Sequence, residues 1–156
     1  MVQSIIENDD YRLWVLMRLS QRALAKAREK ALRRYGISST ESAVLFVIQA
    51  ASDEPTPAEI SRWMFREQHS VSTLLNRMEK KGLIKKTKDL QRKNMVRVGI
   101  TSKGKQIFNK SKQTESVHRL LSVLSKKEHK QLFSILNNLR DRALEDLAIE
   151  YKPPFP

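Results

Sequence analysis

The chain of 156 residues contains no cysteine. This absence excludes disulfides, thiol redox switches, cysteine nucleophiles and cysteine-ligated zinc sites. Glycine and proline are also scarce, with four and five copies. A sequence that is poor in these helix breakers and rich in Ala, Leu, Lys, Arg and Gln favours a mainly helical fold.

Long apolar runs are missing as well. The longest spans residues 43–48, whereas a helix that crosses a bilayer needs about 20 apolar residues. The first residues, MVQSIIENDDYR, are acidic where a signal peptide would be basic. We therefore expect a cytoplasmic protein with no membrane partner.

Motifs that carry catalysis are absent too. The sequence has no phosphate-cradling glycine-rich loop, no G-x-S-x-G and no H-E-x-x-H. Glu115 and His118 lie at the i, i+3 spacing, but in a chain with three histidines and no cysteine a surface pair is favoured over a metal site. We expect neither an enzyme nor a bound metal or cofactor.

The sequence does contain a strong concentration of positive charge. Its net charge is +13. Residues 62–110 hold fourteen Lys and Arg against three Asp and Glu, whereas residues 1–61 hold eight of each kind. Clustered positive charge is typical of proteins that bind polyanions. The alternative, a basic surface kept for solubility, does not need such clustering.

Capping residues and glycines predict where the helices begin and end. A first helix follows Asn8 or Asp9 and ends at Gly36, and a second begins after Ser38, where S-S-T-E forms a capping box. Further helices are expected over residues 57–64, 68–81, 102–122 and 126–149. Residues 84–88 and 96–100 change to a strand-like pattern and predict a hairpin.

The helices over 57–64 and 68–81 predict a helix–turn–helix. Val71, Leu74, Leu75 and Met78 share one face of the second helix, and the opposite face carries polar groups with no acid before Glu79. Such a helix fits the major groove of B-DNA. The alternative is a plain helical corner. The candidates for contact with base edges are Gln68, His69, Ser70, Ser72, Thr73, Asn76 and Arg77, and those for phosphates near the turn are Arg62 and Arg66.

A basic hairpin directly after a helix–turn–helix is typical of the wing of a winged-helix domain. Arg92 and Lys93 at its tip are candidates for the minor groove. The candidates for phosphate contacts along the hairpin are Lys85, Lys86, Lys88 and Arg97. The alternative for the hairpin alone is an exposed loop with solubilising lysines.

The run STLLNRMEKKGLIKK, then Asp89, then MVRVGITSKGKQIF resembles the MarR family of bacterial transcription regulators. The resemblance extends over nearly the whole chain. It implies an obligate homodimer on a pseudo-palindromic operator, often a repressor that a ligand relieves. It also implies a wing with Asp-x-Arg, in which the Asp steadies an Arg in the minor groove. Asp89 matches, but Gln91 occupies the Arg position, which leaves Arg92 or Lys93 for that role.

The fold class that follows is mainly α. Residues 36–100 form a winged helix–turn–helix DNA-binding lobe, and residues 1–35 and 101–156 form dimerisation helices. Apolar residues in the terminal helices exceed what one small lobe can cover, which favours two-fold pairing over a fold-back onto their own core. These residues are Ile5, Ile6, the segment 120–124, Leu132, Phe133, Ile135, Leu136 and Leu139.

Trp14, Met17 and Arg18 are candidates to line a cleft between the dimer helices and the lobe. The resemblance implies that phenolic or other small anionic effectors bind there. The alternative, which the apolar pattern favours, places Trp14 and Met17 in the core.

Two other functions remain open at this stage. One is a sequence-independent architectural DNA-binding protein. The other is an RNA-binding winged-helix module, which usually has a basic disordered tail or aromatic stacking platforms. The tails here are near neutral, and residues 62–110 contain just Trp63, Phe65 and Phe108 as aromatics.

Overall fold

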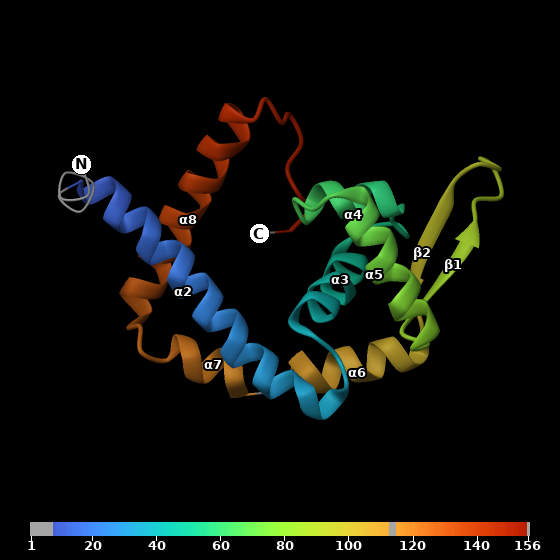
Figure 1. The fold of residues 1–156 in the computed structure, drawn as a ribbon, viewed down its shortest axis with the longest axis horizontal. Coiled ribbons are helices and arrows are strands. Elements are labelled where there is room, and N and C mark those ends of the chain that lie inside the picture. Colours follow the sequence, from blue (N-terminus) through green and yellow to red (C-terminus); the bar gives the residue numbers. More distant parts are fainter. Residues whose placement is uncertain (1–7, 113–114, 156) are drawn as a thin grey trace.

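The computed structural model describes residues 8–112 and 115–155. Helices dominate it, and one small hairpin interrupts their succession (Figure 1). The prediction of a mainly helical winged fold is confirmed. In chain order the elements are α2 (Asp9–Leu32), η1 (Arg33–Tyr35), α3 (Ser39–Ala50), α4 (Pro57–Trp63), α5 (Gln68–Lys80), β1 (Ile84–Lys88), β2 (Val96–Ile100), α6 (Ser102–Lys112), α7 (Glu115–Leu121) and α8 (Lys126–Asp146).

The helix starts lie where the capping residues predicted them. The Asn8 side chain accepts a hydrogen bond from the Tyr11 N–H and caps α2. Ser38, Thr56 and Ser125 each form a complete capping box with the glutamate three residues on. Each box satisfies two N–H groups that the first helical turn leaves without a partner.

Several predicted helix ends differ from the structure; the first helix, for example, ends at Leu32 and is followed by the short η1. The helix expected over 102–122 is described as α6 and α7, with residues 113–114 outside the description. The two helices pack against different parts of the molecule: Phe108 of α6 packs into the core of the lobe, whereas Val117 of α7 faces α2 and α8. The last helix ends at Asp146 instead of Ile149, since Ala148 takes a φ of 52° and the Ile149 N–H donates back to the Leu144 carbonyl.

The hairpin is a two-stranded antiparallel sheet in which Ile84 pairs with Ile100 and Lys88 with Val96. The Val98 N–H also donates to the Pro55 carbonyl at 2.8 Å, so the loop before α4 borders the second strand. This contact attaches the hairpin to the helical part of the lobe.

The main core lies inside the lobe. Apolar side chains from α3, α4, α5 and the hairpin are buried together, and Leu32 from α2 and Phe108 from α6 close the cluster. The fully buried members within the lobe are Val44, Leu45, Ile60, Val71, Leu75, Met78 and Val98.

Helices α2, α7 and α8 lie on the other side of the molecule (Figure 1). Large apolar side chains on α2 and α8 are exposed in the single chain, so these helices do not fold back onto a core of their own. Ile5 and Ile6, which were predicted to join this surface, lie outside the described residues. The exposed residues are Leu13, Trp14, Leu16, Leu19, Leu24, Leu132, Phe133, Ile135, Leu136 and Leu139.

Within residues 8–112 and 115–155, every helix is too short or too polar to span a membrane.

Candidate nucleic-acid interface

Helix α5 separates its polar and apolar residues onto two faces. Val71, Leu74, Leu75 and Met78 are buried against the lobe. All the residues predicted to meet base edges are exposed on the other face. No acid occurs in the first turn of α5, although its N-cap residue, Glu67, is an exposed acid.

The connection from α4 to α5 is tight and internally bonded. Phe65 adopts a positive φ of 51°, which turns the chain sharply. The Arg66 N–H donates to the Ser61 carbonyl at 3.0 Å, and the buried Ser61 hydroxyl donates to the Arg66 carbonyl. The two bonds fix the angle at which α5 leaves α4, which is what a helix–turn–helix requires.

Glu41 connects α3 to the C-terminal end of α5. Its side chain is buried, and Lys81 Nζ lies 2.9 Å and Arg77 Nε 3.3 Å from a carboxylate oxygen. Burial alone would raise the pKa of Glu41, but the Ser38 N–H, the Lys81 ammonium and the Arg77 charge lower it below its ordinary value. Arg77 therefore has a structural partner as well as an exposed guanidinium.

Asp89 organises the wing. Its carboxylate accepts hydrogen bonds from the N–H groups of Gln91 and Arg92 at 2.8 and 3.0 Å, and from Arg97 Nε at 2.9 Å. The bond from the Gln91 N–H, with those from Arg97 and the Arg92 N–H, lowers the pKa of Asp89. The carboxylate thus shapes the turn itself and does not depend on an Arg at position 91.

Arg97 was predicted to reach phosphates, but the structure engages it at the base of the wing. Besides Asp89, its guanidinium donates to the Glu54 carbonyl at 3.1 Å and lies 3.9 Å from a Glu59 oxygen. These contacts use most of the guanidinium edge, so the phosphate role of Arg97 stays a prediction.

Apart from Lys86, the other basic residues of the wing are exposed. Gln91, Arg92 and Lys93 are exposed at the tip, and Arg92 Nη1 lies 3.7 Å from the Met95 sulfur. Lys88 is exposed as well, while Lys85 lies 3.9 Å from Glu54 in a solvent-exposed pair. A pair of this kind is weak and competes poorly with a phosphate.

Lys86, another candidate for phosphate contact, is half-buried. Its ammonium lies beside the Asn76 amide oxygen and 3.7 Å from Glu79. Asn76 belongs to the outward face of α5, so this contact joins the wing to the recognition surface.

Arg62 and Arg66 are exposed on either side of the turn. The Arg62 guanidinium lies 5.3 Å from the centroid of the Tyr151 ring, which comes from the C-terminal segment. This contact was not visible in the sequence, because 89 positions separate the two residues along the chain.

The predicted effector residues lie elsewhere than expected. Trp14, Met17 and Arg18 line an open hollow of about 430 Å³ whose other walls, Gln21 and Arg22, also belong to α2. The hollow is therefore not a cleft between the dimer helices and the lobe. The alternative of a core position stays a prediction as well: in the single chain Trp14 is 54% exposed, whereas Met17 is half-buried.

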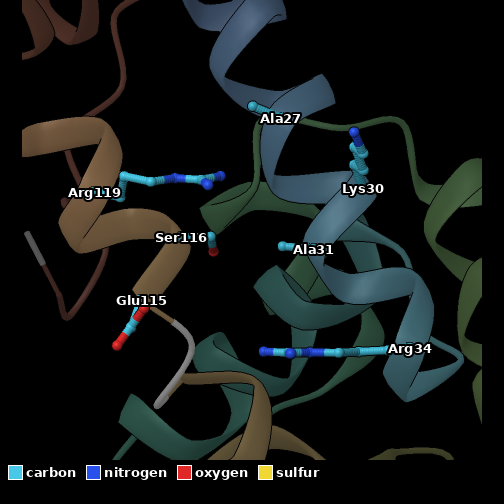
Figure 2. A pocket seen from close by; sticks show the side chains of 7 residues that line it. All are labelled: Ala27, Lys30, Ala31, Arg34, Glu115, Ser116 and Arg119. Atoms are coloured by element: carbon cyan, nitrogen blue, oxygen red, sulfur yellow. The ribbon is translucent and has the colours of Figure 1, made fainter.

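A second, basic hollow of about 560 Å³ lies between α2 and α7 (Figure 2). Figure 2 shows Arg34 of η1 and Arg119 of α7 extending into it while the Glu115 carboxylate points away. Ala27 and Ala31 leave room between the helices. Sequence reasoning missed this site, because the spacing of Lys30 and Arg34 on one helical face does not show that α7 packs there.

Arg28 connects the walls of this region. It donates to the Ser116 hydroxyl at 2.8 Å and to the Ser111 carbonyl at 2.9 Å, and burial lowers its pKa. The C-terminal half of α2 is thereby joined to both α6 and α7.

Among the described residues, no three His, Asp or Glu side chains gather as a metal site requires. An apolar groove of about 680 Å³ does run along α2, α7 and α8. It includes Leu16, Leu24, Leu120, Leu132 and Leu136.

Comparison with known proteins finds similarity to one family. Residues 35–98 match the sequence model described as the MarR family. The organohalide-sensing transcriptional regulator RdhR, solved with 2,4-dichlorophenol, is 28% identical with a TM-score of 0.84 over 96% of this chain and 90% of that one. No curated protein sequence matches the chain.

Two DNA complexes share the fold. A point mutant of MarR from E. coli, solved with operator DNA, is 21% identical, with a TM-score of 0.77 over 85% of this chain and 96% of that one. MepR from S. aureus, solved as a DNA complex, is 24% identical, with a TM-score of 0.73 over 82% of this chain and 96% of that one.

Proposed function

We propose that the chain is a regulator of the MarR family, whose sequence model matches residues 35–98, and that it binds double-stranded DNA sequence-specifically. It acts as a homodimer on a pseudo-palindromic operator and represses transcription until a small effector releases it. The family is one of regulators and not of enzymes, and the fold of the solved DNA complexes agrees with this class.

The outward face of α5 is the observation that carries the proposal. It projects Gln68, Asn76 and several hydroxyls from a helix whose other face is buried. Amides pair with adenine and hydroxyls with bases or phosphates in the major groove. The exposed wing tip supplies positive charge beside it, and phosphate contacts of this kind fix the register in which bases are read.

The terminal helices support a homodimer. We assign residues 36–100 to the DNA-binding lobe and residues 1–35 and 101–156 to dimerisation. The apolar groove between α2, α7 and α8, with the exposed leucines of α8, is surface that a second copy would cover. Two-fold pairing would present two α5 helices to half-sites ~34 Å apart.

The basic hollow is the better supported effector site. Lys30, Arg34 and Arg119 form walls that attract a small phenolate or carboxylate, and the two alanines provide an apolar floor. RdhR was solved with a chlorophenol. An anion bound here would draw α7 toward α2. This movement would shift the dimer between two spacings of its DNA-binding lobes, and only one of these spacings fits DNA. The hollow with Trp14, Met17 and Arg18 is the second candidate.

The test of DNA recognition compares the protein's own upstream intergenic DNA with random duplex of equal length at about 150 mM salt. Fluorescence anisotropy should show a preference of roughly 10³ or more for the operator. Asn76→Ala should lower this preference, whereas Lys130→Ala on α8 serves as a matched surface control. Equal binding to both duplexes would favour the architectural protein, and a preference for structured RNA the RNA-binding module.

The effector test uses 2,4-dichlorophenol and salicylate as probes of the phenol and carboxylate classes. A probe that binds should release the operator, and Arg119→Ala should weaken that release. Arg142→Ala removes an exposed arginine of α8 outside the hollow and should leave it unchanged. If the probe still releases the operator from Arg119→Ala but not from Arg18→Ala, the effector site would be the hollow lined by Trp14, Met17 and Arg18.

A further inference from the structure

The C-terminal segment, residues 147–155, leaves α8 and crosses to the DNA-binding lobe. Figure 1 shows it descending from the end of α8 to α4. Within the segment, Lys152 Nζ pairs with an Asp141 oxygen of α8 at 2.9 Å. The segment is therefore held to the helix that it leaves, as well as to the lobe that it reaches.

Phe155 anchors the far end. Its ring meets Phe46 of α3 edge-on, with centroids 5.4 Å apart and planes at 78°. It meets Trp63 of α4 in the same way, at 6.3 Å and 85°. Edge-to-face pairs at these distances are favourable beyond the area that they bury. Phe155 also packs against the core cluster of the lobe.

Tyr151, directly before Lys152 in the chain, lies against the Arg62 guanidinium at 5.3 Å. Arg62 belongs to the last turn of α4, directly before the turn that leads to α5. Among the described residues it has no acidic partner within ion-pair distance. In the described part of the chain, the guanidinium of Arg62 is therefore held by a cation–π contact with the Tyr151 ring.

A guanidinium that rests on a ring is held by its face, while its N–H groups lie in its plane and remain available. A bidentate phosphate contact uses those same N–H groups. A stacked arginine has also lost part of the rotamer freedom that it would otherwise lose on binding. Stacking on Tyr151 therefore prepares Arg62 for a phosphate and does not compete with it.

We propose that the C-terminal segment is part of the DNA-binding machinery: Tyr151 is a positioning residue that holds Arg62 for a DNA phosphate, and Phe155 fixes the segment on α3 and α4. This inference rests on the proposed DNA-binding function. It assigns a DNA-binding role to a segment outside the winged lobe, residues 36–100.

The first experiment is a double-mutant cycle on operator affinity. Arg62→Ala should weaken binding and lower the slope of log affinity against log salt by about 0.9, which corresponds to one phosphate contact. Tyr151→Leu should weaken binding about two- to fivefold and lower the slope in the same direction. Tyr151→Phe keeps the ring face and should restore affinity. In the Arg62→Ala background, Tyr151→Leu should have no further effect.

Additive effects of the two substitutions, or native affinity in Tyr151→Leu, would overturn the positioning role while operator binding stands. If the native chain shows no operator preference, the proposed function fails and the positioning role with it. The two failures are therefore distinguishable within one set of titrations.

The second experiment tests the anchor without DNA. In a Trp14→Phe background, Trp63 is the remaining tryptophan of the chain, and Phe155 shields its ring. Phe155→Ala should shift the Trp63 emission to longer wavelength and increase its quenching by acrylamide, with the far-UV circular dichroism unchanged. Identical emission and quenching in the two proteins would show that the segment is not seated on α4 and would overturn the inference.

Discussion

Replacing Glu41 by glutamine would remove the negative charge that α3 presents to Lys81 and Arg77 while it keeps the size of the side chain. Glutamine also keeps the capping box with Ser38, because its amide oxygen can accept the hydrogen bond that the Ser38 N–H donates to the carboxylate. The substitution therefore isolates the electrostatic contact between α3 and the end of α5.

The expected loss follows from the contacts. A hydrogen bond to a charged group contributes about 1.5–3 kcal/mol, and Glu41 makes two, at 2.9 and 3.3 Å. Lys81 and Arg77 keep 40% and 58% of their side-chain surface exposed, so solvent screens both contacts. We expect a loss of about 2 kcal/mol in the free energy of unfolding, or about 4–8 °C in Tm.

Thermal unfolding followed by circular dichroism across a pH series would check this value. The folded-state pKa of Glu41 lies below its ordinary value. Its contribution is therefore complete above the unfolded-state pKa and is lost as pH falls through the folded-state pKa. The stabilities of the native chain and of Glu41→Gln should differ at neutral pH and converge in acid.

Glu128→Gln is the matched control, because Glu128 forms the same capping box with Ser125 without a cationic partner among the described residues. It should unfold close to the native Tm. Equal midpoints for Glu41→Gln and Glu128→Gln at neutral pH would refute the argument that the ion pairs of Glu41 with Lys81 and Arg77 stabilise the lobe.

Three further predictions concern function and assembly. Arg77→Ala should weaken operator binding and lower the preference for operator over random DNA, measured by anisotropy on protein that circular dichroism shows to be folded. An unchanged ratio would remove Arg77 from base reading. Arg92→Ala at the wing tip should weaken binding and flatten its salt dependence, and a native salt slope would exclude Arg92 from the contacts. Leu136→Glu places a charge in the apolar groove of α8 and should yield monomers, so a dimer mass in light scattering would contradict the proposed interface.

The local signals in the sequence were sufficient for the lobe. Caps such as Ser38 and Thr56, the glycines after helices and the two-residue period of 96–100 each specify structure within a few residues. The inward and outward faces of α5 were also predictable, since the 3.6-residue period alone assigns them. The exposed candidates at its N-terminal end lie where that period placed them.

Contacts between distant residues were not predictable. No local sequence pattern shows that Glu41 forms an ion pair with Arg77. The same holds for the hydrogen bonds from Arg97 to Asp89 and Glu54, and for the contact between the rings of Phe155 and Trp63. The position of the predicted effector residues depends on such contacts as well. Trp14 and Met17 lie on an apolar stripe, but the position of the lobe relative to α2 depends on tertiary packing that no periodicity encodes.

The residues that helix α5 buries in the core are Val71, Leu74, Leu75 and Met78. Its exposed polar residues can therefore change at little cost in stability, since surface substitutions away from such packing are nearly neutral. Over generations, a lineage could acquire a new operator by altering these positions while the scaffold stays intact. Arg77 is the exception, because a change there also affects Glu41, and we expect it to vary more slowly than its neighbours.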